Sequence, residues 1–130
     1  MIISTAGIAK KNNKFLMALR IPGTSIGESW EFPGGKANGA ETPEDALKRE
    51  FREELDIDIA VGKRICNGNF ENNGTKYEIY GFLIELLSEK ISLHEHSRVE
   101  WFTLEDMASL KMAGSDKQIV QALKYLYLPE

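Results

Sequence analysis

The sequence predicts an α+β fold, an α/β/α sandwich with helices outside a mixed β-sheet. Short β-prone segments recur along the 130 residues, and helical segments with apolar stripes separate and follow them. Strands of this kind bury their apolar faces against helices, which produces layered folds. No repeat, linker or low-complexity segment divides the chain. We therefore expect a single domain spanning residues 1–130.

The N-terminal part of the chain predicts a β-hairpin followed by a loop. Residues 3–10 and 14–20 are apolar and β-prone, and residues 11–13 between them have the composition of a turn. Residues 21–29 contain a proline and two glycines, which predicts an exposed loop.

A short strand and a turn lead to the helix with the clearest boundaries. The strand at 30–32 ends at Pro33-Gly34-Gly35, a strong turn signal. Thr42 is a suitable N-cap, and Pro43 suits the first helical position. The apolar side chains that follow recur at helical spacing and predict a buried stripe: Ala46, Leu47, Phe51 and Leu55.

The second half of the chain alternates strands and turns and closes with helices. We expect strands at 57–61, 63–70, 77–86 and 99–102, with a turn at 72–74. A short helix at 104–110 and a closing helix at 116–126 follow. This order completes the mixed sheet with helices on its outside.

Composition and charge exclude several classes of function. The net charge is −4 without a block of lysine or arginine, so we expect no nucleic-acid polymer as partner. The single cysteine, Cys66, has no internal disulfide partner, and no Cys/His set has zinc spacing. No apolar run reaches the roughly 18 residues that cross a membrane, and the N-terminus does not resemble a signal peptide. We therefore expect a cytoplasmic protein without membrane contact.

Three carboxylates share the surface of the predicted helix opposite its apolar stripe. Glu50, Glu53 and Glu54 are spaced i, i+3 and i+4, so their side chains converge. This cluster alone has two interpretations. It is either a solvated surface whose charge Arg49 and Arg52 offset in part, or a hard oxygen site suited to Mg²⁺ or Mn²⁺ beside phosphates.

A longer pattern of fixed spacings surrounds this cluster. It consists of Gly35, five residues, Glu41, seven residues, Arg49-Glu50, Phe51, one residue and Glu53-Glu54. This pattern resembles the signature of the Nudix hydrolases. Asp56 stands where the family has glycine. Since Asp adopts the left-handed conformation at modest cost, we expect a weaker helix stop and an intact metal site.

The resemblance covers nearly the whole chain, to about Leu123, and implies both fold and activity. The segment from Trp30 to Lys36 resembles the one that enters the signature in MutT-type enzymes. This branch includes 8-oxo-dGTP diphosphatases and CTP pyrophosphohydrolases. The resemblance therefore implies a single Nudix domain that hydrolyses a nucleoside triphosphate to a monophosphate and pyrophosphate with Mg²⁺, or Mn²⁺, and sanitises the nucleotide pool in support of DNA repair. Which nucleobase it prefers stays open.

The resemblance also implies roles for individual residues. Expected metal ligands are the Gly34 carbonyl, Glu50, Glu53, Glu54 and Glu95. Expected catalytic residues are Glu53, with Glu95 as the alternative proton acceptor, and Arg49, which orients a metal-binding carboxylate. Expected substrate-binding residues are Arg20, Phe32, Lys36 and Asp116.

Plain structural interpretations compete with these roles. Arg20 also fits a solvated charge, Glu95 an exposed loop residue, Asp116 a helix N-cap and Phe32 a core residue. Two other functions also stay open: hydrolysis of a different Nudix substrate such as ADP-ribose, and a non-catalytic nucleotide-binding module. The sequence is compatible with a monomer or a homodimer.

Overall fold

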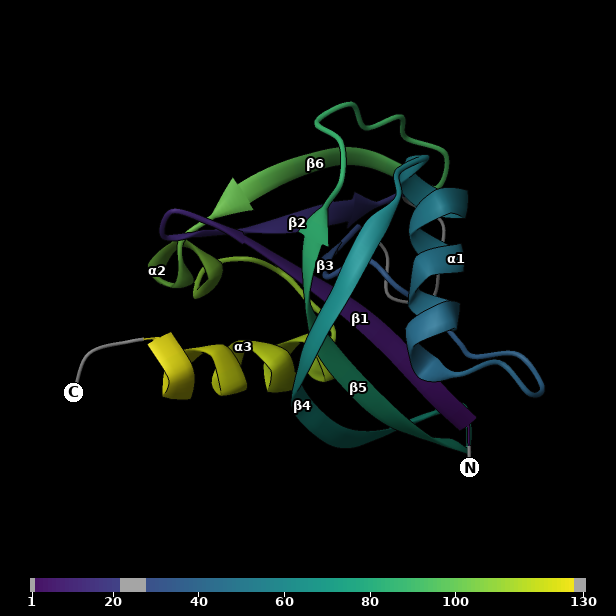
Figure 1. Ribbon diagram of the computed structural model, residues 1–130. Coiled ribbons are helices and arrows are strands. Elements are labelled where there is room, and N and C mark those ends of the chain that lie inside the picture. Colours follow the sequence, from purple (N-terminus) through teal and green to yellow (C-terminus); the bar gives the residue numbers. More distant parts are fainter. Residues whose placement is uncertain (1, 22–27, 128–130) are drawn as a thin grey trace.

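A layer of helix lies on each side of a twisted β-sheet in the computed structural model, which describes residues 2–21 and 28–127 (Figure 1). The elements follow in the order β1 (Ile2–Lys11), β2 (Lys14–Arg20), β3 (Trp30–Glu31), α1 (Pro43–Leu55), β4 (Ile59–Asn72), β5 (Thr75–Leu86), β6 (His96–Phe102), α2 (Leu104–Met107) and α3 (Gly114–Tyr127). The predicted α/β/α sandwich is confirmed.

Strand β1 connects the two halves of the mixed sheet. It runs parallel to β5, with Ile2 opposite Tyr77 at one end and Ala9 opposite Ile84 at the other. Strand β5 in turn pairs antiparallel with β4. At its other end β1 turns into β2 through the predicted hairpin. Strand β2 then pairs antiparallel with both β3 and β6.

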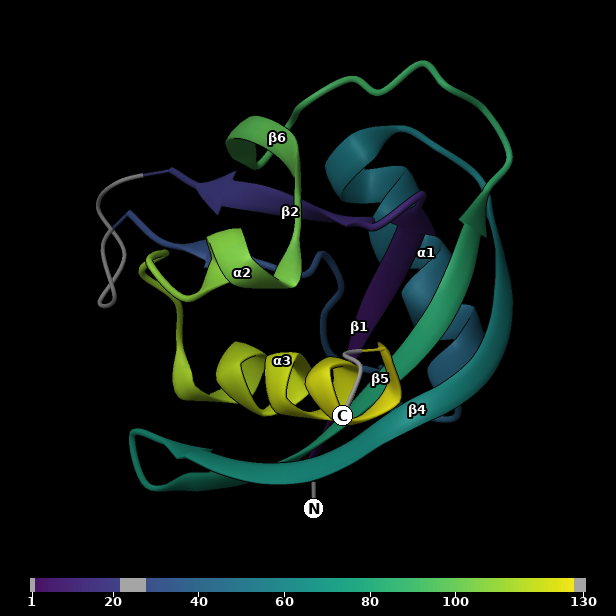
Figure 2. The same cartoon turned by 90° about the vertical axis from the view of Figure 1, so that its left-hand side faces the viewer.

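Each face of the sheet has its own hydrophobic core. Alternate residues of a strand point to opposite faces, so Ile8 packs with α2 and α3 whereas Ala9 packs with α1. Figure 2 shows α3 in front of the sheet and α1 behind it. The α1 side buries the stripe expected from the sequence: Ala46, Leu47, Phe51 and Leu55.

Several predicted boundaries were wrong. The strands expected at 57–61 and 63–70 form the single strand β4, whose register shifts between Val61 and Arg64. From the sequence, this irregularity looks like a loop between two strands, because Gly62 and Lys63 are both exposed. Strand β6 starts at His96, three residues before the prediction, and α2 ends at Met107, three residues before its predicted end.

The remaining differences are small. Helix α3 starts at Gly114, two residues before the prediction. Most of the loop expected at 21–29 lies outside the described residues. Within the described part of the chain, no helix is long and apolar enough to span a membrane.

Candidate active site

Helix α1 ends immediately after its cluster of carboxylates. At its start, Oγ1 of Thr42 accepts a hydrogen bond of 3.1 Å from the backbone N–H of Asp45, which confirms the predicted N-cap. At its end, Asp56 adopts the left-handed conformation (φ 55°, ψ 41°), and its N–H bonds the carbonyl of Arg52. Asp56 therefore fills the glycine position of the signature in the backbone conformation expected of it.

The structure brings together Glu50, Glu54 and Glu95. Each offers a carboxylate oxygen, and these oxygens lie within 4.8 Å of one another. Glu54 is 3% exposed, and burial together with the charges of neighbouring carboxylates raises its pKa far above the ordinary value. Three acidic groups held this close repel one another, and a divalent cation between them would remove that cost. The donor set fits Mg²⁺ or Mn²⁺.

The backbone of the loop before β6 brings Glu95 to α1. The N–H of Ser92 donates to the carbonyl of Leu55 at 3.0 Å, and the N–H of His94 donates to that of Glu54 at 3.2 Å. Carbonyls in the last turn of a helix lack partners within the helix, so they are available for such bonds. The loop is thereby tied to the helix end next to the position of Glu95.

The segment containing Gly34 runs alongside β1 with little space for side chains. The carbonyls of Pro33 and Gly35 accept hydrogen bonds from β1, whereas no described donor bonds the carbonyl of Gly34. A Cβ at Gly34 would clash with the carbonyl oxygen of Thr5, and one at Gly35 would lie 2.5 Å from Cδ of Glu50. Gly34 therefore allows this segment to approach β1, and Gly35 leaves room for the carboxylate of Glu50.

Arg49 connects the start of the signature with its carboxylates. Its guanidinium donates two hydrogen bonds to Glu41 and one of 2.9 Å to Glu50. It also bonds the carbonyl of Lys36 at 2.9 Å. The Arg49 guanidinium lowers the pKa of Glu41, and Glu41 in turn raises the pKa of Arg49.

Glu53 lies outside the group of converging carboxylates. Its side chain is 56% exposed, and Oε2 accepts a hydrogen bond of 3.2 Å from Nη1 of Arg49. Among the described residues that line the neighbouring cavity, Glu50, Glu54 and Glu95 are present and Glu53 is not.

A cavity of about 770 Å³ adjoins the carboxylates. The predicted substrate-binding residues all line it: Arg20, Phe32, Lys36 and Asp116. The side chain of Phe32 is also part of the hydrophobic core and is 3% exposed, so its core interpretation is confirmed. Lys36 is exposed, with Nζ 5.4 Å from the centre of the Tyr77 ring.

Asp116 is buried at the wall of this cavity. It lies inside the first turn of α3 and not before it, so the N-cap interpretation is wrong. Oδ1 accepts a hydrogen bond of 3.0 Å from the backbone N–H of Phe32. Burial raises the pKa of Asp116 to about 7, although the bond from Phe32 opposes that shift.

The cavity is also lined by titratable residues that the sequence did not single out, and two of them, Glu31 and His96, contact each other. Glu31 comes from β3 and His96 from β6, and their side chains meet at 2.8 Å. Their separation of 65 positions hides this contact in the sequence. Only the pairing of both strands with β2 brings the two side chains together.

Both the sequence and the structure match known proteins. A family model described as "NUDIX domain" matches residues 1–123. The chain is 29% identical over 126 residues to the CTP pyrophosphohydrolase of Escherichia coli (strain K12). The matched region covers 97% of this chain and 93% of that protein. It is 46% identical over 57 residues to the 8-oxo-dGTP diphosphatase of Proteus vulgaris, and this match covers 44% of this chain and 51% of that protein. The solution structure of the E. coli ORF135 protein matches with a TM-score of 0.86 and 29% identity, over 100% of this chain and 95% of that one.

Proposed function

Because the chain belongs to the Nudix hydrolase family, we propose that it hydrolyses a nucleoside triphosphate to the monophosphate and pyrophosphate. One observation carries this proposal. The carboxylates of Glu50, Glu54 and Glu95 converge at the cavity that Arg20 and Asp116 also line. A basic group is thus available for the phosphates, carboxylates for a metal ion beside them, and a buried polar group for the base.

A divalent metal ion, Mg²⁺ or Mn²⁺, completes the proposed site. Glu50, Glu54, Glu95 and the carbonyl of Gly34 would hold it, with Glu53 as a further candidate ligand. When bound, such an ion neutralises phosphate charge and lowers the pKa of the attacking water. Two observations support this assignment: no donor among the described residues bonds the carbonyl of Gly34, and the carboxylates repel one another.

The other roles in the reaction belong to side chains of the protein. Arg20 and Lys36 bind the phosphates, and Arg49 fixes the orientation of Glu50 through their hydrogen bond. Glu53 or Glu95 accepts the proton of the attacking water. Both side chains are exposed, so either carboxylate is able to pass the proton on to solvent.

Asp116 is the proposed contact for the nucleobase. With a pKa of about 7, its carboxyl exists as both donor and acceptor near neutral pH. It therefore suits either the amine of cytosine or the hydrogen-bonding edge of an oxidised guanine. We propose that the substrate belongs to one of these two classes, as the names of the similar proteins also suggest.

A substrate panel tests the proposal. In a panel of CTP, dCTP, dGTP, 8-oxo-dGTP and ADP-ribose, we expect Mg²⁺-dependent release of pyrophosphate, with the highest kcat/KM for a cytosine nucleotide or for 8-oxo-dGTP. Preferred cleavage of ADP-ribose would assign a different Nudix activity. Nucleotide binding without turnover of any member would instead indicate a binding module.

A further inference from the structure

Three strands bring the side chains of Arg20, Glu31 and His96 to the cavity. Strand β2 lies between β3 and β6, so the end of β2 meets residues from both neighbours. Arg20 is opposite His96, and the register shifts between Leu19 and Arg20. A bulge of this kind changes the direction of a side chain at the end of a strand. All three side chains line the cavity.

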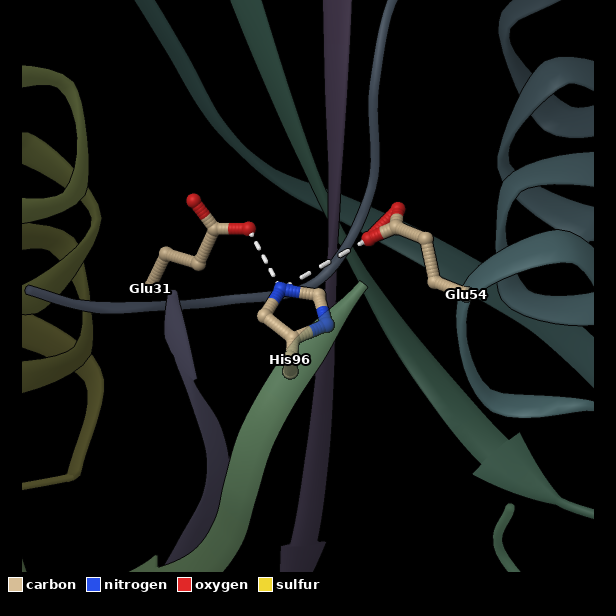
Figure 3. Close-up of side chains that lie close together, drawn as sticks. All are labelled: Glu31, Glu54 and His96. Carbon is tan, nitrogen blue, oxygen red and sulfur yellow. Dashed lines mark hydrogen bonds and ion pairs between the residues drawn. The ribbon is translucent and has the colours of Figure 1, made fainter. Parts of the chain in front are cut away.

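The side chain of His96 lies within hydrogen-bond distance of Glu31. The imidazole is 3% exposed, and its Nε2 lies 2.8 Å from Oε2 of Glu31. The nearest oxygen of Glu54 is 3.9 Å from the same nitrogen, beyond hydrogen-bond distance. Figure 3 shows the imidazole pointing between these two carboxylates, which come from β3 and α1. A buried ring with this contact leaves Glu31 little freedom to rotate.

The second oxygen of Glu31 faces Arg20. Oε1 lies 3.6 Å from Nε of Arg20, whose side chain is 35% exposed. An arginine side chain loses rotamer entropy when it is ordered. A carboxylate that is itself held in place reduces that loss at the moment of binding.

We infer that His96 and Glu31 are a positioning pair, in which His96 holds Glu31 and Glu31 directs the guanidinium of Arg20 toward the phosphates of the substrate. This inference rests on the proposed function, because the phosphate contact of Arg20 is part of it. Neither His96 nor Glu31 needs to touch the substrate. Their effect on binding is therefore expected to depend on Arg20.

A double-mutant cycle on nucleotide binding tests this dependence. The probes are α,β-methylene CTP and α,β-methylene 8-oxo-dGTP with Mg²⁺, titrated calorimetrically so that no turnover is needed. We expect His96→Leu and Arg20→Ala each to weaken binding about 10-fold, and the double variant to be no weaker than Arg20→Ala. Roughly 100-fold weakening in the double variant, or unchanged binding in His96→Leu, would overturn the inference.

Two further variants separate positioning from general damage to the fold. His96→Gln keeps an N–H donor for Glu31, so binding within about threefold of wild type is expected. Glu31→Gln keeps the volume but removes the charge beside Arg20, and it should weaken binding only while Arg20 is present. His94→Leu is the matched control, since His94 is exposed in the loop just before His96 and its replacement should leave the Kd unchanged.

The outcomes distinguish this inference from the proposed function. If the wild-type protein binds the analogues and the cycle is additive, the positioning pair is refuted and the hydrolase remains. If the coupling is found without turnover of any triphosphate, the proposed hydrolysis is refuted and the positioning pair remains. If neither analogue binds, both are overturned.

Discussion

Nε of Arg49 lies 2.8 Å from Oε2 of Glu41, and Nη2 of the same guanidinium lies 3.0 Å from Oε1. This two-point contact fixes the plane of the guanidinium, and the same group then reaches Glu50 at 2.9 Å. A signature glutamate eight residues upstream thus orients one of the converging carboxylates through an arginine.

Arg49→Lys is expected to lower kcat by about 10- to 100-fold, because an ammonium group cannot form the planar two-point contact. The matched control is Arg52→Lys, whose exposed contact of 2.8 Å with Asp58 should contribute little. Steady-state kinetics and thermal unfolding of both variants would check this. Equal activity losses in the two variants would contradict the orienting role.

Glu54→Gln is expected to raise the stability of the metal-free protein and to remove its response to metal. The amide does not carry the charge that burial and neighbouring carboxylates oppose at this position. We expect unfolding to require about 1 to 3 kcal/mol more at pH 8 without metal. We expect Mg²⁺ to raise the Tm of the wild type but not that of this variant, and kcat should fall about 100-fold or more.

The control for this variant is Glu44→Gln, since Glu44 is exposed in the first turn of α1. It should retain both the Mg²⁺ response and the activity. A Glu54→Gln protein that is still stabilised by Mg²⁺ as strongly as the wild type would remove Glu54 from the proposed metal site.

The sequence predicted features whose causes are local. Thr42 caps α1, the apolar stripe of α1 is buried, and Asp56 is left-handed, because each depends on neighbours within about one helical turn. The hairpin between β1 and β2 was predicted for the same reason. The fixed spacings of the signature then allowed residues of the site to be named without the fold.

Contacts between distant segments were not predictable in this way. The bond between Asp116 and Phe32 spans 84 residues, and that between His96 and Glu31 spans 65. Each depends on which strands are neighbours, and no local propensity encodes that choice. Two strands were predicted in place of β4, because its exposed irregularity at Gly62 resembles a loop.

Asp56→Gly is expected to stabilise the protein by about 0.5 kcal/mol, because glycine adopts φ 55° without the strain of a Cβ. The greater flexibility of glycine in the unfolded chain offsets part of this gain. Urea unfolding should show a higher midpoint with an unchanged m-value. Asp56→Ala should instead lower stability by about 1 kcal/mol, and a gain in that variant would contradict the backbone argument.

Asp116→Asn is expected to change how stability depends on pH. With a pKa of about 7 when folded and an ordinary value of 3.8, the folded protein binds the additional proton between these pH values. The unfolding free energy of the wild type therefore falls as pH rises from about 4 to 7. Asparagine lacks this ionisation but still accepts the bond from Phe32.

The variant should thus gain stability relative to the wild type by roughly 1 to 4 kcal/mol between pH 4 and pH 8. Urea unfolding at several pH values measures the difference. Asp45→Asn, an exposed change in the first turn of α1, should show a nearly constant difference across the same range. A constant difference for Asp116→Asn as well would refute the raised pKa.

Glu53→Gln tests which carboxylate accepts the proton from water. We expect kcat to fall by about 1,000-fold while Tm stays within a few degrees of the wild type, because the side chain is 56% exposed. Its contact with Arg49 at 3.2 Å is a surface contact and contributes little to stability.

Glu95→Gln provides the comparison, since Glu95 already lines the cavity with Glu50 and Glu54. If the substituted glutamate is the base, the pH–kcat profile of the variant should lose its acidic limb. The variant of the other glutamate should keep the acidic limb, with a lower kcat. Activity near that of the wild type in Glu53→Gln would exclude Glu53 from both metal binding and proton transfer. Proton acceptance would then pass to Glu95, the exposed carboxylate that the loop before β6 ties to the end of α1.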